Sequence, residues 1–429
     1  LSVNVFAGAN LRQENYSGVG QSTVGGLSTP NYFNIAASVD RPSVSSYVSR
    51  KDVRSLYGTA TLGFADIVYL DASVRNDWSS SLPEAENSYL YYGFSTSIVF
   101  TELGFFRNQD ILSFGKLRAS VAQVGDDLGP YQIFTTYSIN SPYGSNPAQT
   151  VPNTLKNPAL RAAISSDIEF GADLRFLNGR LRTDVNYYQR IREDEILQLT
   201  VPGASGYSSA TVNAGKFTTT GLEVQLGATV LQNRDWNVDL TANWAASNST
   251  VDKLAEGLTA RQLEYAYFGL AIYAREGEEW GTITTTGGYG GFLRDDAGNK
   301  VVGSNGLYQR ETNMDLGHIL PDWTGGFSAN VSYKNLSLSA ALDFQKGGKF
   351  YSISKMFNAY SGLGEMTVGN NELGNPLRDP VLDANGNEVA YVKLGEAASN
   401  SGGVVVRGVD ANGNPVEYLR EAVGHFGNL

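Results

Sequence analysis

SDIEFGADLRFLNGRLRTDVNYYQR, residues 166–190, has the pattern of a β-hairpin. In its first half apolar side chains alternate with polar ones, so one face of a strand would carry Ile168, Phe170, Ala172, Leu174 and Phe176. Asn178-Gly179 then supplies two residues that tolerate the positive φ angles of a type I′ turn. Alternation resumes through Thr183, Val185 and Tyr187. The stretch therefore predicts two antiparallel strands.

The same alternation with a period of two residues recurs along the whole chain. It predicts eleven strands and no helix of comparable length. The predicted strands cover about residues 2–12, 52–64, 67–78, 89–100, 112–124, 166–176, 181–192, 218–230, 236–246, 323–333 and 336–346. The chain is also rich in Gly and Tyr, with 48 and 24 residues, which suits many turns and half-exposed strands.

Short and longer connections between the predicted strands alternate along the chain. The short ones are 65–66, 101–111, 177–180, 231–235 and 334–335, and the longer ones are 13–51, 79–88, 125–165, 193–217, 247–322 and 347–429. In an up-and-down meander, all short connections lie at one end of the strands and all long ones at the other. Transmembrane β-barrels show this asymmetry, with short periplasmic turns and long extracellular loops.

Charge is segregated between the two faces of the predicted strands. The clearest apolar faces contain no Asp, Glu, Lys or Arg, whereas the opposite faces carry Asp71, Arg75, Asp167, Glu169, Asp173, Arg175, Arg182, Asp184, Arg190, Glu223, Asp239 and Asp343. A lipid-facing Arg or Lys costs roughly 2 to 4 kcal/mol at the bilayer midplane, whereas a water-filled lumen tolerates charge. We therefore predict an all-β fold, a transmembrane antiparallel up-and-down β-barrel with its apolar surface in the lipid bilayer.

A soluble sandwich is the alternative, because its strands also alternate, with the apolar face turned inward. The segregation of loop lengths favours the barrel, and so do strands of about 11 residues. Small residues on the apolar faces point the same way; they are Ala7, Ala9, Ala72, Ala172, Ala242 and Ala340.

The segment WNVDLTANW, residues 236–244, indicates where a strand would meet the membrane surfaces. Trp236 and Trp244 lie on its apolar face, roughly 26 Å apart along a strand and about 20 Å apart across the membrane at a 40° tilt. That span nearly matches an apolar band about 25 Å tall between two aromatic girdles. We predict that the two tryptophans are membrane-interface residues and that Asp239 faces the lumen.

Composition excludes several other classes of protein. A formal net charge of −11 and a pI near 4.8 argue against binding to nucleic acid, which needs a basic face. Without cysteine there is no disulfide, thiolate nucleophile or Cys-based zinc site. The sequence contains no run of 18 or more apolar residues, so it predicts no membrane-spanning helix. The strand-like start LSVNVFAGANLRQ lacks the features of a signal peptide, so we expect a mature chain or a fragment.

Several segments resemble the SusC family (SusC/RagA) of TonB-dependent outer-membrane transporters from Bacteroidetes-type bacteria. They are LSFGKLRASVAQVGDD (112–127), LRFLNGRLRTDVNYYQR (174–190), NAGKFTTTGLEVQL (213–226), AREGEEWGTI (274–283), LGHILPDWTGGFSANVSYKNLSLS (316–339) and DFQKGGKFYS (343–352). Their order makes the match specific, and it covers most of the chain.

The resemblance implies a 22-stranded barrel in the outer membrane of a Gram-negative bacterium. It implies an N-terminal plug, coupling to the TonB complex and a SusD-like surface lipoprotein as a lid. The implied activity is uptake of large nutrients such as oligosaccharides or peptides. This sequence departs from the family pattern, because it shows no plug, no TonB-binding segment and about half of the strands.

We accordingly expect strands and extracellular loops over residues 1–346 and a long extracellular loop region over 347–429, leading to closing strands that are missing. A second reading stays open, in which a SusC-like barrel is a structural subunit of a larger outer-membrane machine for secretion or assembly. A plug and a TonB-binding segment in the full-length protein would favour transport, and their loss would favour the structural role.

Residues suited to catalysis are scarce, and we predict no enzyme, no catalytic residue and no cofactor. His318 and His425 are the only histidines, and neither has a nucleophile nearby in the sequence. His318 is expected at a junction between a loop and a strand. The pair Glu278-Glu279 is expected on a solvated or lid-contacting face.

Three acidic turns occur, DDAGN at 295–299 and DANGN at 383–387 and 410–414, and in the second of them Asp383, Asn385 and Asn387 offer oxygens at alternating positions. An EF-hand loop starting at Asp383 would need Gly and Glu where Glu388 and Leu394 stand, so we predict turns at hairpin tips and no metal site. Aromatic residues between 265 and 289 could stack on sugar rings or pack within the loop. They are Tyr265, Tyr267, Phe268, Tyr273, Trp280 and Tyr289.

Overall fold

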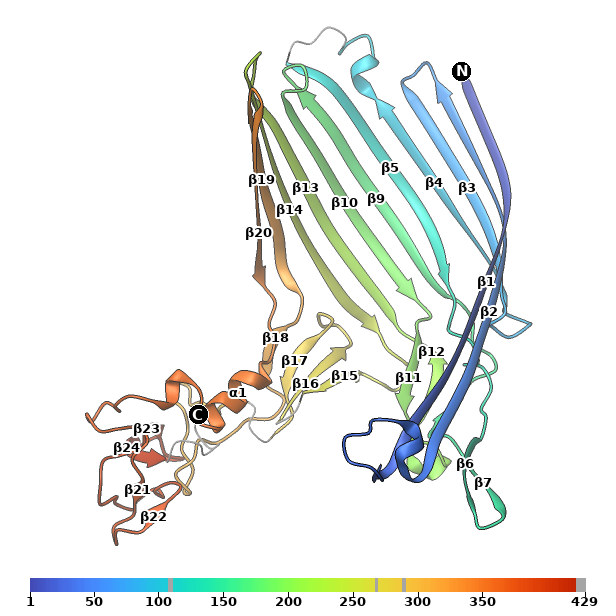
Figure 1. The fold of residues 1–429 in the computed structure, drawn as a ribbon. Helices are drawn as coiled ribbons and strands as arrows, with labels where there is room; N and C mark the ends of the chain where they lie inside the picture. The colour runs from blue at the N-terminus through green and yellow to red at the C-terminus, as the bar shows by residue number, and fades with distance from the viewer. Residues whose placement is uncertain (107–110, 267–268, 288–290, 422–429) are drawn as a thin grey trace. The chain divides into compact units, whose positions relative to one another are not determined.

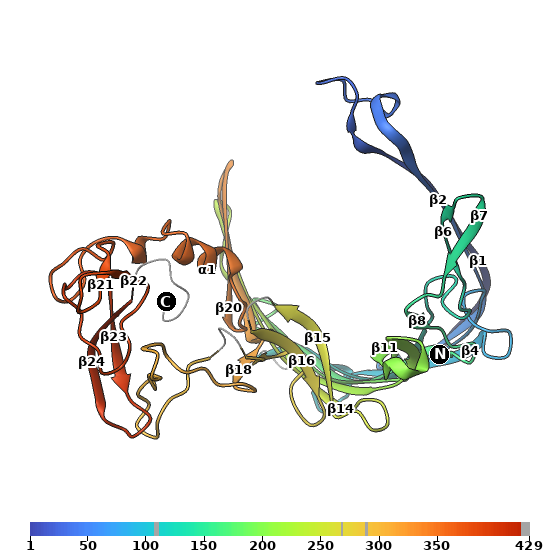
Figure 2. The same ribbon diagram turned by 90° about the horizontal axis from the view of Figure 1, so that it is seen from below.

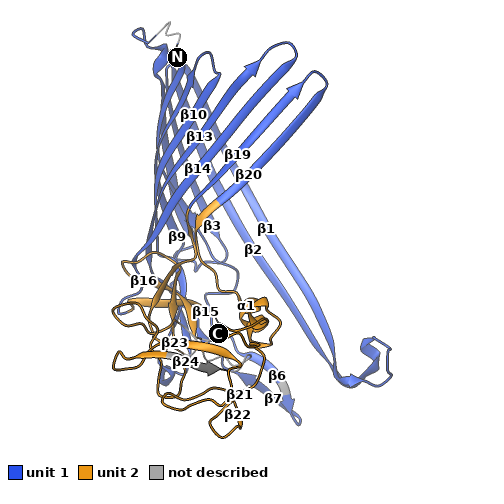
Figure 3. Ribbon diagram, turned by 90° about the vertical axis from the view of Figure 1, so that its left-hand side faces the viewer, with its two compact units in different colours: residues 1–257, 323–344 blue, residues 258–322, 345–429 orange. Residues whose placement is uncertain are grey.

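The computed structural model describes residues 1–106, 111–266, 269–287 and 291–421. Two compact units make up the chain (Figure 3). Unit 1 comprises Leu1–Gly257 and Trp323–Phe344, and unit 2 comprises Leu258–Asp322 and Gln345–Leu429. Among the described residues, no helix is long and apolar enough to cross a membrane.

Unit 1 is built on an antiparallel sheet of eleven strands (Figure 1). Each strand pairs with the next one of the sheet along the chain, so the topology is an up-and-down meander. The strands are β1 (Ser2–Leu27), β2 (Ser38–Phe64), β3 (Val68–Ser79), β4 (Ser88–Val99), β5 (Leu112–Asp126), β9 (Ala163–Phe176), β10 (Leu181–Glu193), β13 (Lys216–Gln232), β14 (Trp236–Lys253), β19 (Pro321–Tyr333) and β20 (Leu336–Gly347). All eleven predicted strands are thereby confirmed. Seen along the strands, the sheet curves as an open arc (Figure 2).

The prediction that residues 13–51 form a loop was wrong. β1 and β2 stay paired from Glu14↔Lys51 to Ser22↔Ser43, and only residues 28–37 connect them. Serine, valine and glycine in this stretch weaken the alternation, but pairing satisfies the backbone groups of both strands, and Tyr16 stacks on Tyr47 at 5.2 Å. The result is a two-stranded ribbon that extends beyond the remaining strands (Figure 2).

A buried polar cluster anchors the base of this ribbon. Lys51 Nζ lies 2.5 Å from Asp127 Oδ1 and donates to the carbonyl of Leu128 at 3.1 Å. The other carboxylate oxygen of Asp127 accepts hydrogen bonds from Ser79 and Ser81. The cluster therefore joins β2 to the connections that follow β3 and β5.

Residues 177–180 connect the two strands of the 166–190 hairpin, as predicted. Asn178 and Gly179 have the predicted positive φ angles, 56° and 81°, and Leu177 has one as well, 53°. The N–H of Gly179 donates to the carbonyl of Phe176 at 3.1 Å, and that of Arg180 to the carbonyl of Leu177 at 3.3 Å. Strand pairing resumes at Phe176↔Leu181, which sets this register. The hairpin itself is confirmed. The turn at Ala65-Asp66, with φ angles of 52° and 58°, lies where the sequence predicts a short link.

The longer connections of unit 1 contain short strands of their own. These are β6 (Ser138–Tyr143), β7 (Asn146–Thr150), β8 (Thr154–Leu155), β11 (Ile196–Thr200) and β12 (Ser209–Asn213). Short 3-10 helices occur at Ile35–Ala37, Phe100–Glu102 and Gly203–Ser205. A small apolar core of Leu82, Leu128, Ile133, Leu160 and Ala162 packs among these connections.

Unit 2 has secondary structure that the sequence analysis did not predict, because its strands are too short for an alternating pattern to be recognised. It contains β15 (Ala260–Ala266), β16 (Leu270–Arg275), β17 (Thr282–Thr285), β18 (Asp315–His318), α1 (Ile353–Tyr360), a 3-10 helix (Glu365–Thr367), β21 (Val381–Leu382), β22 (Glu388–Val389), β23 (Val404–Val409) and β24 (Pro415–Glu421). Ser352 caps α1 by accepting a hydrogen bond from the N–H of Lys355. Five valines form a core: Val302, Val381, Val392, Val406 and Val416.

Candidate functional site: the polar face of the sheet

The strand register of unit 1 brings polar side chains of neighbouring strands together on one face. Cross-strand partners on this face include Asp71↔Ser95, Arg190↔Asp167, Asn186↔Glu223, Asp184↔Gln225 and Asp239↔Asn330. The predicted polar residues therefore share one surface, called here the polar face. The opposite surface is called here the apolar face, and large hydrophobic side chains are exposed on it. The exposed fractions of Leu336 and Leu338, for example, are 74% and 71%.

Ion pairs cross the polar face between strands. The guanidinium of Arg118 binds both carboxylate oxygens of Asp184 at 2.7 Å, and Arg190 binds Asp167 at 2.7 and 3.1 Å. Arg118 and Asp184 lie on β5 and β10, so the contact passes over β9. Gly171 of β9 makes this possible, because a Cβ there would collide with the Arg118 side chain. The glycine thus has a packing role that its position in a strand does not reveal by itself.

A second polar cluster lies on β2, β3 and β4. Arg75 donates to Asp77 and to Ser55, both at 2.8 Å, and the hydroxyl of Tyr91 donates to Asp77 at 2.9 Å. The Arg75 guanidinium also lies 5.5 Å from the centre of the Tyr57 ring. Because Arg75 and Asp77 pair with each other, the cluster is close to neutral and presents tyrosine rings beside hydrogen-bonding groups.

A groove runs along the polar face next to this cluster. One part has a volume of about 360 Å³ and includes Thr61, Asp71, Ser95 and Ser120. Another has about 280 Å³ and includes Tyr57, Arg75 and Tyr91. The two parts share lining residues, namely Thr59, Ser73, Gly93 and Ala122. Gly93 lies in the middle of β4, and a side chain there would project into the groove beside Ser73. A glycine within a strand marks such sites of close approach.

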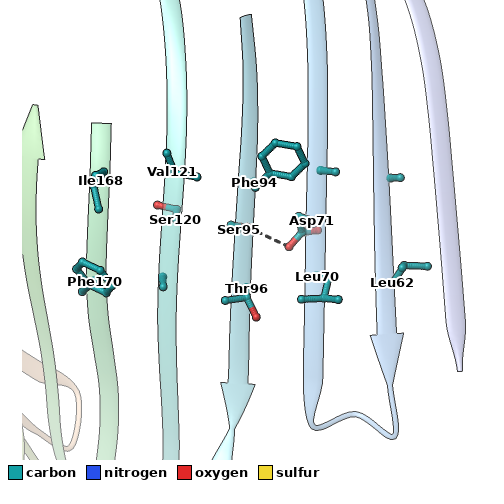
Figure 4. Close-up of a pocket in the computed structure, with 13 residues that line it drawn as sticks. Leu62, Leu70, Asp71, Phe94, Ser95, Thr96, Ser120, Val121, Ile168 and Phe170 are labelled. Carbon is teal, nitrogen blue, oxygen red and sulfur yellow. Dashed lines mark hydrogen bonds between the residues drawn. The ribbon is translucent and has the colours of Figure 1, made fainter. Parts of the chain in front are cut away.

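A larger hollow, of about 510 Å³, lies on the apolar face (Figure 4). Its apolar walls come from Leu62, Leu70, Phe94, Ile168 and Phe170, which Figure 4 labels on β2, β3, β4 and β9. Ala60, Ala72 and Ala119 also line it and leave the space open. Because its surroundings are apolar side chains on the exposed face, this hollow suits hydrocarbon and not polar cargo.

Trp236 and Trp244 both lie on the apolar face of β14, with exposed fractions of 39% and 36%. The Trp236 ring packs against Tyr333 of β19, with 4.5 Å between ring centres. Trp244 lies opposite Gly325 of β19 and Val224 of β13. Asp239 lies on the polar face, where it accepts hydrogen bonds from Thr229 at 2.7 Å and Asn237 at 2.6 Å.

Within unit 2, His318 is the last residue of β18, as expected for a junction residue. Its Nε2 lies 3.1 Å from Glu279 and 3.6 Å from Asp322. Glu279 therefore contacts a histidine, and Glu278 lies 3.5 Å from Arg275. His425, Tyr267, Phe268 and Tyr289 lie outside the described residues.

The three acidic turns lie at hairpin tips, as the sequence predicts. In each, the aspartate at the first position accepts hydrogen bonds from two backbone N–H groups and from the asparagine at the fifth; these aspartates are Asp295, Asp383 and Asp410. These hydrogen bonds hold the pKa of each carboxyl below its usual range. The carboxylates thus stabilise the turns in which they lie.

Comparison with known proteins places this geometry in a family. A family model described as "TonB dependent receptor-like, beta-barrel" matches residues 1–380. TonB-dependent receptor P26 of Formosa agariphila is 24% identical over 85% of this chain and 39% of its own length. TonB-dependent receptor SusC of Bacteroides thetaiotaomicron is 22% identical over 76% of this chain and 35% of its own. A structure of the RagAB peptide transporter matches 85% of this chain and 41% of its own, with 23% identity and a TM-score of 0.69.

These matches define an outer-membrane β-barrel. The chain belongs to the TonB-dependent receptor-like β-barrel family, and its resemblance to SusC is confirmed. The family is one of receptors and transporters in the outer membrane of Gram-negative bacteria. The chain spans about two fifths of the length of these relatives, 39% for P26 and 41% for RagAB.

Proposed function

We propose that this chain forms barrel wall and surface loops of a SusC-like TonB-dependent transporter that imports large nutrients, oligosaccharides or peptides. One observation carries the proposal: the register separates a charged, grooved face from an apolar one across eleven strands. Membership of the TonB-dependent receptor-like β-barrel family supports the further proposal that transport is inward and energised through TonB. Catalysis is no part of the proposal.

The complete transporter would close a 22-stranded barrel, with the polar face toward the lumen. Residues 1–346 would supply strands and extracellular loops, and residues 347–429 an extracellular region before the closing strands. Trp236 and Trp244 would sit at the two membrane interfaces. A plug, a TonB-binding N-terminal segment and a SusD-like lipoprotein lid would complete the machinery.

Filling the groove tests the proposal. In the full-length protein, Gly93→Phe places a ring on the polar face and is expected to reduce uptake of the nutrient that supports growth. Gly58→Phe is the matched control, because a Cβ at Gly58 meets only the carbonyl of Phe6, at 3.6 Å, and the side chain would point to the apolar face. Both variants should assemble in the outer membrane.

Normal uptake by correctly assembled Gly93→Phe would contradict a cargo path along this groove. Co-purification then separates transport from a structural role. A transporter should return one SusD-like lipoprotein, and its absence together with several unrelated barrels would instead indicate a subunit of a larger outer-membrane machine.

A further inference from the structure

The hollow of about 510 Å³ on the apolar face has a floor of small side chains and a rim of large ones. It is called here the apolar hollow and crosses β2, β3, β4, β5 and β9 (Figure 4). Its floor consists of Ala60, Ala72, Thr96 and Ala119, and its rim of Leu62, Leu70, Phe94, Val121, Ile168 and Phe170. None of these ten side chains carries a charge, and Thr96 has the one hydroxyl among them.

The hollow arises from strand register and not from one local segment of sequence. Ala60 of β2 lies directly opposite Ala72 of β3, and Thr96 of β4 lies opposite Ala119 of β5. Phe94 is the partner of Ala72 on β4 and stands beside the gap. Two pairs of small residues thus lie in neighbouring rows of the same face, and the floor crosses three strand spacings, roughly 14 Å. The gap is therefore elongated.

The rim side chains remain exposed, so the described part of the chain does not cover the hollow. The exposed fractions are 54% for Phe94 and 55% for Phe170, on opposite sides of the floor. Leu62, Leu70 and Ile168 are also exposed. Whatever fills the hollow therefore comes from the surroundings of the apolar face.

The lining of the hollow suits neither water nor a polar ligand. An ordered water needs two to four polar partners, and the side chains of floor and rim offer only the hydroxyl of Thr96. Asp71 also borders the hollow, but its carboxylate accepts hydrogen bonds from Thr61 at 2.6 Å and from Ser95 at 3.3 Å on the polar face. Hydrocarbon, in contrast, loses no hydrogen bond by entering such a space.

We propose that the apolar hollow holds the acyl chain of a membrane lipid. Lipid and protein are equally apolar at this face, so packing decides where a chain stays. A chain on the flat wall touches protein on one side, whereas a chain in the hollow touches floor and rim together and gains dispersion contacts. An acyl chain is linear and flexible, which matches an elongated gap that crosses four strands. The inference rests on the proposed function for the orientation of the apolar face toward lipid.

Photo-crosslinking of the full-length protein in lipid vesicles tests the inference. The vesicles consist of phosphatidylethanolamine and phosphatidylglycerol, with a trace of a phospholipid that carries a diazirine on its acyl chain. Labelled peptides are mapped by mass spectrometry. In the wild type, the residues of the hollow are expected to be labelled about tenfold more than apolar-face residues 238–244 of β14, because a held chain stays beside them longer.

Two variants fill the floor of the hollow, and a third provides the matched control. Ala72→Phe and Ala119→Ile should each reduce the labelling of the hollow to the level of β14. Ala242→Phe adds the same ring to the apolar face of β14, where its neighbours are Leu226 and Phe327, and should leave the labelling of the hollow unchanged. The heat-dependent shift in gel mobility verifies that each variant is folded.

Equal labelling of the hollow and β14 in the wild type would overturn the inference, since lipid in free exchange would then cover both. An excess that survives both filling variants would also overturn it. Protection of the hollow from the label, together with crosslinks between two barrels, would replace the lipid with a second copy of the chain. Failure of the proposed function would look different, because the label would then reach the polar-face residues Thr241 and Asn243 as readily as Ala242.

Discussion

Leu240 and Thr241 are neighbours in β14 whose side chains point to opposite faces of the sheet. Their partners on β19 are Ala329 and Ser328. Leu240→Arg is expected to cost roughly 2 to 4 kcal/mol if this part of the apolar face lies near the bilayer midplane. Thr241→Arg should be tolerated, because its side chain points to the polar face. The measurement is the fraction of folded protein in isolated outer membranes, read from the heat-dependent shift in gel mobility. Equal yields of the two variants would refute the assignment of faces.

The faces of single residues could be predicted from the sequence, because alternation fixes which side chains share a surface. The partners of these residues could not. Arg118 pairs with Asp184 two strands away, and this depends on Gly171 between them, 53 residues from Arg118 in the chain. The groove around Gly93 was missed for the same reason. A glycine within a strand was the available signal, but its neighbours depend on register, which the sequence pattern does not fix.

At the scale of elements, the buried cluster around Asp127 should hold the β1–β2 ribbon to its neighbouring connections. Side chains of Lys51 and Asp127 are only 14% and 12% exposed. Asp127→Ala leaves the ammonium of Lys51 buried without its partner, and we expect a loss of about 3 to 5 kcal/mol in local stability. Limited proteolysis followed by mass spectrometry should show earlier cleavage within residues 127–162. Asp126→Ala is the control, since Asp126 is exposed. Equal cleavage of both variants would exclude this anchoring role.

The hairpin of β23 and β24 depends on its turn at Asp410. The carboxylate accepts hydrogen bonds from the side chain and the N–H of Asn414, and these lower the pKa of Asp410. The ionised form therefore stabilises the turn above the ordinary Asp pKa of about 3.9, and this contribution is lost as the pH falls through the lowered pKa. Asp410→Ala should speed hydrogen exchange in Val404–Val409 at neutral pH. The difference from wild type should vanish in acid, and the Asp383 turn should not change. A difference that persists in acid would contradict this account.

Elements with strong alternation and turn residues could be predicted, whereas others could not. The ribbon was missed because Ser43, Ser45 and Ser49 look like loop residues, and pairing with β1 overrides that preference. The strands of unit 2 escaped because runs such as Val381–Leu382 are too short for any period to show. The short strands β21, β23 and β24 each contribute a valine to a core of five valines that are far apart in the sequence. Packing of this kind is decided by tertiary contacts.

At the scale of the whole molecule, the eleven-stranded sheet is predicted to form one continuous barrel wall, with water on its polar face and lipid on its apolar face. The chain contains no cysteine, so a single-cysteine variant carries one thiol. On each of three neighbouring strands, two consecutive residues form a matched pair, in which the first named lies on the polar face and the second on the apolar face. The pairs are Gln225 and Leu226 on β13, Asn243 and Ala242 on β14, and Asn330 and Ala329 on β19.

In intact outer membranes, a water-soluble maleimide should modify the first member of each pair faster than the second, because lipid excludes the reagent from the apolar face. A lipid-soluble maleimide should reverse or remove the difference. Detergent-solubilised protein denatured in urea provides the control, in which all six thiols should react alike. The same order must hold on β13, β14 and β19, since a wall of one barrel cannot change its lipid-facing side between strands. An order that switches from strand to strand would exclude a single membrane-spanning wall, even if every strand assignment were correct.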